Sequence, residues 1–109
     1  MALRSVNPAT GELLESFREQ TPKEVDAAVK KAHQAFSSWS ALAMERRSAL
    51  LRKAAAVLRT EKTSLARMMS EEMGKPVLQA IAEVEKCALV CEYYAESGPA
   101  MLQPEPIAS

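Results

Sequence analysis

Apolar positions recur every three or four residues along most of this chain, which is the spacing of helices that bury one face. The first such run opens with Thr21-Pro22-Lys23-Glu24, a capping box with proline at the first helical position. A helix is therefore predicted over residues 21–39. Its apolar stripe, which we expect to be buried, consists of Val25, Ala28, Val29, Ala32 and Phe36.

Residues 43–73 form a second helical region whose apolar positions keep one phase throughout. The face that we expect to be buried consists of Leu50, Ala54, Val57, Leu58, Leu65, Met68 and Met69. Glu61 and Lys62 intrude on this apolar side. A break is therefore predicted near residues 59–63, with nearly collinear helices on either side.

A third helix is predicted over residues 76–97. Gly74 supplies a left-handed cap for the preceding helix, and Pro76 prevents simple continuation. Gly98-Pro99 is expected to end the third helix and leave residues 98–109 as an extended tail. Leu89 and Tyr93 lie off its main apolar stripe, so this helix is expected to contact a second surface, from more of the same polypeptide or from another subunit.

The beginning of the chain has the pattern of a β-hairpin over residues 2–18. Two short apolar stretches, at residues 3–6 and 13–17, flank Asn7-Pro8-Ala9-Thr10-Gly11-Glu12. Asn-Pro starts a turn, and Gly11 can take the positive φ that closes it. The predicted fold class is mainly α with a short N-terminal β-hairpin, in a single partial domain over residues 1–109.

Composition limits the classes of function. The chain is 48% hydrophobic and 26% charged, and its 14 basic and 14 acidic residues balance. A net charge of zero gives no field that attracts nucleic acid or an anionic membrane. No apolar run is long enough to span a bilayer, and residues 1–8 lack the apolar core of a secretory leader. Two cysteines without such a leader indicate reduced thiols and a cytoplasmic location. A chain of this length is expected to bury about 60–70% of its unfolded surface.

Several residues have the chemistry of functional groups, but their patterns favour structural roles. Cys87 and Cys91 share one side of the third helix and are expected to be buried structural cysteines, not metal ligands or a redox pair. His33 falls on the polar face of the first helix, where a solvated histidine is expected. Glu85, Glu92 and Glu96 line one helix face, which is interpreted as solvated or as meeting a basic partner.

The second helical region also offers a basic side and a run of methionines. The basic side consists of Arg46, Arg47, Arg52, Lys53 and Arg59, and no aromatic residues interleave with it. It is interpreted as a solvated helix face and not as a nucleic-acid surface. Met68, Met69 and Met73 follow the phase of the apolar stripe and are expected in the core.

The three glycines stand alone at predicted turns or caps. A phosphate-binding loop needs several glycines close together, so no nucleotide fingerprint is present. No catalytic, cofactor-binding or metal-binding residue is assigned within residues 1–109.

An ordered set of segments resembles the start of the NAD(P)-dependent aldehyde dehydrogenase superfamily. The segments are Asn7-Pro8-Ala9-Thr10-Gly11-Glu12, Ala35-Phe36, Trp39-Ser40, Arg46-Arg47, Leu50-Leu51 and Glu72-Met73-Gly74-Lys75-Pro76. Glu83-Val84-Glu85-Lys86-Cys87-Ala88 and Cys91-Glu92-Tyr93-Tyr94-Ala95-Glu96 look most like the succinate-semialdehyde dehydrogenase branch. The resemblance covers essentially the whole chain.

The resemblance implies oxidation of an aldehyde, with succinate semialdehyde the leading candidate, to a carboxylic acid. In the family a cysteine attacks the carbonyl, hydride passes to NAD or NADP, and a glutamate-activated water releases the acid. The family is usually homo-oligomeric, and its catalytic and cofactor-binding residues lie downstream of the matched region. Residues 1–109 would then be the outer part of the α/β cofactor-binding domain without its Rossmann-like sheet, and the isolated chain is expected to be inactive.

Two other interpretations stay open at this point. The chain could be a stand-alone helical protein-interaction module without catalytic activity, which should unfold cooperatively as a defined oligomer. It could also be a thiol-based redox sensor that uses Cys87 and Cys91.

Overall fold

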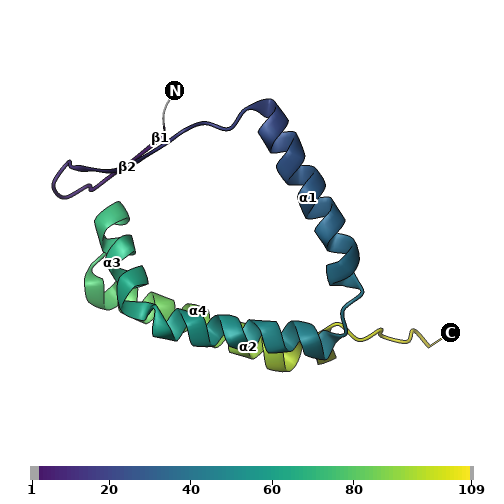
Figure 1. Ribbon diagram of the computed structural model, residues 1–109. Coiled ribbons are helices and arrows are strands. Elements are labelled where there is room, and N and C mark those ends of the chain that lie inside the picture. Colours follow the sequence, from purple (N-terminus) through teal and green to yellow (C-terminus); the bar gives the residue numbers. More distant parts are fainter. Residues whose placement is uncertain (1–2, 109) are drawn as a thin grey trace.

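The most obvious property of the structure, a computed structural model that describes residues 3–108, is its open shape (Figure 1). Its radius of gyration is 19.1 Å and its extents are 62 × 40 × 28 Å. A compact domain of this length has a radius of gyration of about 13 Å. The mainly helical fold with an N-terminal hairpin is confirmed. Ala2 of the predicted hairpin and Ser109 of the predicted tail lie outside the described residues.

The hairpin pairs β1 (Leu3–Val6) with β2 (Leu13–Phe17) in antiparallel register, with an irregularity at Ser5/Val6. Its loop closes as expected, because Gly11 has a φ of +77° and its N–H donates to the Asn7 carbonyl over 2.8 Å. The hairpin lies against the helical part of the chain near Glu72, whose carboxylate accepts from the Ser5 hydroxyl over 3.0 Å.

Helix α1 (Pro22–Ser40) stands apart from the other helices (Figure 1). The predicted capping box is present: the Thr21 hydroxyl accepts from the Glu24 N–H, and the Glu24 carboxylate accepts from the Thr21 N–H. Hydrogen bonds that the Arg18 guanidinium, the Thr21 N–H and the Thr21 hydroxyl donate to the Glu24 carboxylate lower its pKa to about 2. The expectation of a buried stripe was wrong, because α1 buries no side chain against the other described residues.

Helices α2 (Met44–Thr60) and α3 (Lys62–Met73) are separated at Glu61, within the range expected for the break. Helix α3 ends at Gly74, whose φ of +68° is the left-handed cap expected from the sequence. A Cβ at Gly74 would also lie 3.1 Å from the Pro8 ring, so this corner favours glycine both for backbone conformation and for space.

The predicted core face of this region was only partly right: Leu58, Leu65 and Met69 are half-buried, and none of its members is fully buried. Ala55 and Ala66 are fully buried, whereas Leu50, Val57 and Met68 are all more than two-fifths exposed. Met73 is also exposed, so the methionine run does not form a core. Small alanines permit close contact between helices, and the larger apolar side chains remain on a neighbouring face.

Helix α4 (Val77–Met101) packs along α2 and α3 and supplies most of the core. Its buried residues are Ala80, Val84, Ala88 and Ala95. The helix does not end at Gly98-Pro99 as expected; Pro99 lies inside its last turn. A proline there removes a single hydrogen bond, and the last turn is closed by the Leu102 N–H, which donates to the Gly98 carbonyl over 3.1 Å.

Candidate functional site

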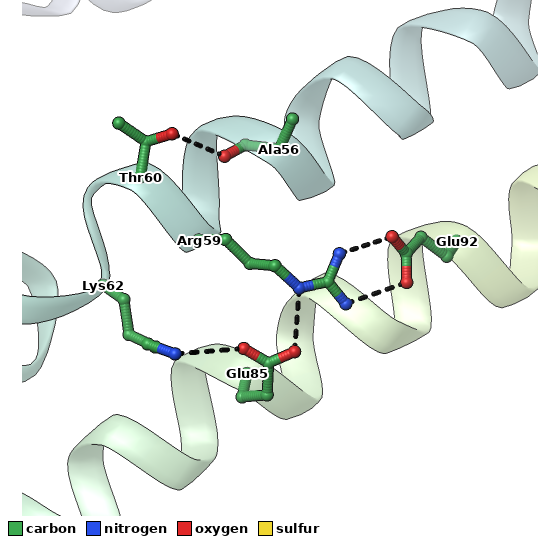
Figure 2. Close-up of polar contacts among 6 residues, drawn as sticks. All are labelled: Ala56, Arg59, Thr60, Lys62, Glu85 and Glu92. Atoms are coloured by element: carbon green, nitrogen blue, oxygen red, sulfur yellow. Dashed lines mark hydrogen bonds and ion pairs between the residues drawn. The ribbon is translucent and has the colours of Figure 1, made fainter.

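Charged side chains converge at one place between the helices, around Arg59 near the end of α2 (Figure 2). Its Nε donates to Glu85 Oε1 over 2.8 Å, and its Nη2 donates to Glu92 Oε2 over 2.9 Å. Nη1 donates to the other oxygen of Glu92, which makes that contact bidentate. Lys62 at the start of α3 reaches the second oxygen of Glu85 at 3.4 Å. We call these four residues the Arg59 clamp.

The spacing within α4 explains how one guanidinium binds two carboxylates. Glu85 and Glu92 are two helical turns apart on the same face, so both can reach an arginine from the neighbouring helix. The fork of the guanidinium supplies several donors in a fixed plane, which lysine cannot do. Glu96, which was grouped with them from the sequence, is exposed and has no part in the clamp.

The clamp holds its groups in their charged forms. The hydrogen bonds that Arg59 donates lower the pKa of the Glu85 and Glu92 carboxyls, and the same bonds, to Glu92 first and to Glu85 second, raise the pKa of Arg59. A carboxylate that is bound to arginine and ionised at neutral pH is a poor proton donor. The clamp therefore fastens α2 and α3 to α4 and does not provide an acid–base pair.

The alternative that Glu85 and Glu92 meet a basic partner agrees with the structure. The sequence did not identify Arg59 as that partner. Arg59 was placed on a solvated basic face, whereas its side chain is only about one-third exposed. The pair of glutamates two turns apart was the pattern that could have identified a guanidinium partner. The sequence does not show which arginine of α2 faces them.

The remaining basic residues do not form one cluster. Arg46, Arg52 and Lys53 are exposed, as expected. Arg47 is half-buried, and its Nε has no partner among the described residues. His33 is exposed on α1, as expected for a solvated histidine.

The expectation of two buried cysteines was wrong. Cys87 is exposed, Cys91 is half-buried, and both are free thiols. They line an open groove along the flank of α4, with Ala82, Lys86 and Val90 among the other lining residues. Alanines occupy the closest contacts of α4 with α2 and α3, which leaves the thiols beside that contact and not within it.

Residues 3–108 contain neither a cluster of glycines nor a group of metal ligands. Gly11 lies in the hairpin loop, Gly74 caps α3 and Gly98 is inside α4, so no loop of residues 3–108 has the clustered glycines that cradle a pyrophosphate. No group of three or more potential metal ligands occurs among the same residues. None of the helices within residues 3–108 has the length and hydrophobicity needed to cross a membrane.

Comparison with known proteins gives a consistent result over the whole chain. The model of the aldehyde dehydrogenase family matches residues 1–109. A probable succinate-semialdehyde dehydrogenase [NADP(+)] of Synechocystis sp. is 40% identical over 109 residues, which are 100% of this chain and 24% of that protein. The succinate semialdehyde dehydrogenase [NAD(P)+] Sad of Escherichia coli is 41% identical over 94% of this chain and 22% of its own length.

Solved structures agree. The succinic semialdehyde dehydrogenase of Streptococcus pyogenes, determined in complex with NADP+, superposes with a TM-score of 0.91 at 29% identity. The match covers 97% of this chain and 24% of that structure. The chain thus spans about a quarter of the length of the proteins that it matches. The chain belongs to the aldehyde dehydrogenase family.

Proposed function

We propose that this chain is the N-terminal part of an NAD(P)-dependent aldehyde dehydrogenase that oxidises aldehydes to carboxylic acids, with succinate semialdehyde the leading substrate. The observation that carries the proposal is the match of succinate-semialdehyde dehydrogenases to nearly all of this chain at about 40% identity. Their printed names give NADP(+) or NAD(P)+ as cofactor, so NADP is the first to test. A cytoplasmic location, expected from the sequence, is part of the proposal.

The surface area of the chain supports a larger polypeptide. The accessible surface is 9002 Å², whereas a compact monomer of 11.9 kDa exposes about 6,000 Å². Only about half of the unfolded surface is buried, less than the 60–70% expected from the length. The excess of about 3,000 Å² lies on one partner alone, several times the roughly 800 Å² that each partner buries in an interface of standard size. The remainder of the enzyme polypeptide, or a second subunit, would cover it.

Within that enzyme, residues 1–109 act as a scaffold and carry out no chemical step. The Arg59 clamp fastens the α2, α3 and α4 helices together, and the exposed apolar faces of α1 and α4 provide contact area. The thiol nucleophile, the base and the cofactor-binding loops of the reaction belong to the remaining three-quarters of the polypeptide. The isolated chain therefore neither binds NAD(P) nor oxidises aldehydes.

The test is to recover the native protein through an affinity tag placed ahead of Met1 in its source cell. We expect a denatured mass several times 11.9 kDa and formation of reduced cofactor with succinate semialdehyde, measured by ultraviolet absorbance with NADP and with NAD. The 109-residue chain, expressed alone, serves as the matched control and should give no reduced cofactor. A native mass near 11.9 kDa, or a large protein inactive on every aldehyde, would overturn the proposal.

A further inference from the structure

Cys87 and Cys91 lie one turn apart on the same continuous helix and open into the same groove. We propose that they form a dithiol site for a soft, thiophilic centre that binds two thiolates, of which trivalent arsenicals are the representative class. The inference uses only the geometry of α4 and does not depend on the proposed enzymatic activity.

The helix itself prevents a direct disulfide. Residues four apart on a helix have their Cβ atoms about 5–6 Å apart, whereas a disulfide requires about 3.5–4.5 Å. Both thiols lie well inside α4, more than two turns from either end, so local unwinding would disrupt hydrogen bonds on both sides. The spacing therefore disfavours the redox sensor considered from the sequence and leaves a gap that one atom between the sulfurs can bridge.

The surroundings disfavour harder metal ions. Structural zinc takes four ligands, and no group of three or more potential ligands lies together among residues 3–108. Glu83 also lines the groove, but its carboxylate is paired with Lys75, so two thiolates without a third free ligand favour a soft centre of low coordination number. Ala82 and Val90 give the groove apolar walls against which an aryl group on arsenic can lie.

Nothing within residues 3–108 closes access to the thiols, and the alkylation control below tests whether the rest of the polypeptide covers them. Cys87 is exposed, and Cys91, although half-buried, lines the same open groove. The side chains in the tightest contact with α2 and α3 are alanines of α4, so a bridge on its flank leaves that packing in place. The chemistry is balanced without a redox step: an aryl arsenic(III) oxide forms two As–S bonds, and its oxygen leaves as water with the two thiol protons.

The probe is phenylarsine oxide, added to the reduced, native polypeptide recovered through the tag ahead of Met1. After alkylation with iodoacetamide, peptide mass mapping reads Cys87 and Cys91 separately from any other cysteine of that polypeptide. We expect both thiols to be alkylated without the probe, and both to be protected by one bound arsenic. The two attachment points should make binding at least about 100-fold tighter than binding to either thiol alone.

Three variants isolate the geometry. Cys87→Ser and Cys91→Ser should each weaken binding at least about 100-fold. The double variant Cys91→Ser/Leu89→Cys keeps two cysteines but places them two residues apart, where helix side chains do not face each other. It should bind as weakly as Cys91→Ser, and Leu89 is exposed enough to accept the change.

Several results would overturn the proposal. Thiols that resist alkylation in the native polypeptide, with or without probe, would mean that the groove is covered. An adduct on one cysteine only, or equally tight binding by the double variant, would mean that the spacing has no effect. We also expect the wild-type protein to keep its helicity, measured by circular dichroism, after arsenic bridges the two thiols. Loss of helicity would contradict a site built on intact α4.

Discussion

Helix α1 and the α2–α4 pair are both amphipathic, yet only the pair buries side chains against the described residues. Helix α1 has the better local start, with a complete capping box and proline at its first position, whereas α2 and α4 have no side-chain cap. Helices α2 and α4 have alanines at their contacts and the Arg59 clamp between them. The difference shows that capping decides where a helix begins, while a complementary surface decides whether it packs.

The largest effect should follow from filling the close contact between the helices. Ala88→Leu, at a fully buried site of α4, is expected to lower the free energy of opening of the α2–α4 pair by about 1–3 kcal/mol through overpacking. Ala28→Leu makes the same change on exposed α1 and should alter stability by less than about 0.5 kcal/mol. Residue-resolved amide hydrogen exchange on the 109-residue chain measures both. Equal costs would mean that α1 is packed.

A smaller effect is expected from removing the Arg59 clamp. Arg59→Met keeps most of the side-chain length but leaves Glu92 without its cation and Glu85 with Lys62 alone, so the opening of α2 and α4 should become easier. Arg52→Met, on the exposed side of α2, is the matched control and should change little. Hydrogen exchange that is equal in the two variants would show that the clamp contributes nothing.

Lowering the pH should weaken the Arg59 clamp by protonating its two carboxylates. Because Arg59 lowers the pKa of Glu85 and Glu92 below the ordinary 4.5, the clamp stabilises fully above that pH. Its contribution is lost as the pH falls through the lowered values, where the carboxylates take up protons. The difference in thermal stability between the wild-type chain and Arg59→Met should therefore shrink on acidification. A difference that is constant with pH would contradict the assignment.

The smallest effect on the chain as a whole should come from the cap of α1. Thr21→Ala removes the hydroxyl that accepts from the Glu24 N–H and should cost about 1 kcal/mol of local helix stability. The effect should be confined to the first turns of α1, since that helix makes no buried contact with α2–α4. Hydrogen exchange gives the check: loss of protection in α2–α4 would show that the two regions are coupled.

Features set by neighbouring residues could be predicted from the sequence. The start of α1, the positive φ of Gly11 and Gly74 and the interruption near Glu61 all follow from local backbone chemistry. The covered face of α2 and α3 could not be predicted, because Leu50 and Val57 of α2 and Met68 of α3 form an apolar face beside the alanines that pack. Periodicity indicates that a helix face is apolar, but it does not indicate which element packs against that face.

The same limit explains the errors at the candidate site. Cys87 and Cys91 follow the apolar phase of α4, but the alanines beside them take the contact with α2. The sequence alone does not distinguish Arg59 from the exposed arginines of α2, because it does not show which side of α2 faces α4. Pro99 would end an isolated helix, whereas in α4 it falls in the last turn and removes only one hydrogen bond.

The separation of α1 from the α2–α4 pair also has a consequence for the order of events during synthesis. A ribosome adds about 5–20 residues per second, so in a polypeptide four times this length the first quarter is complete on the order of tens of seconds before the last. The contacts of α2, α3 and α4 lie within one short stretch of sequence and can form while translation continues. In such a polypeptide the apolar stripe of α1, which has no such neighbour among residues 3–108, would stay exposed until later residues arrive. In a cell, this helix is the part of the nascent chain that most needs protection.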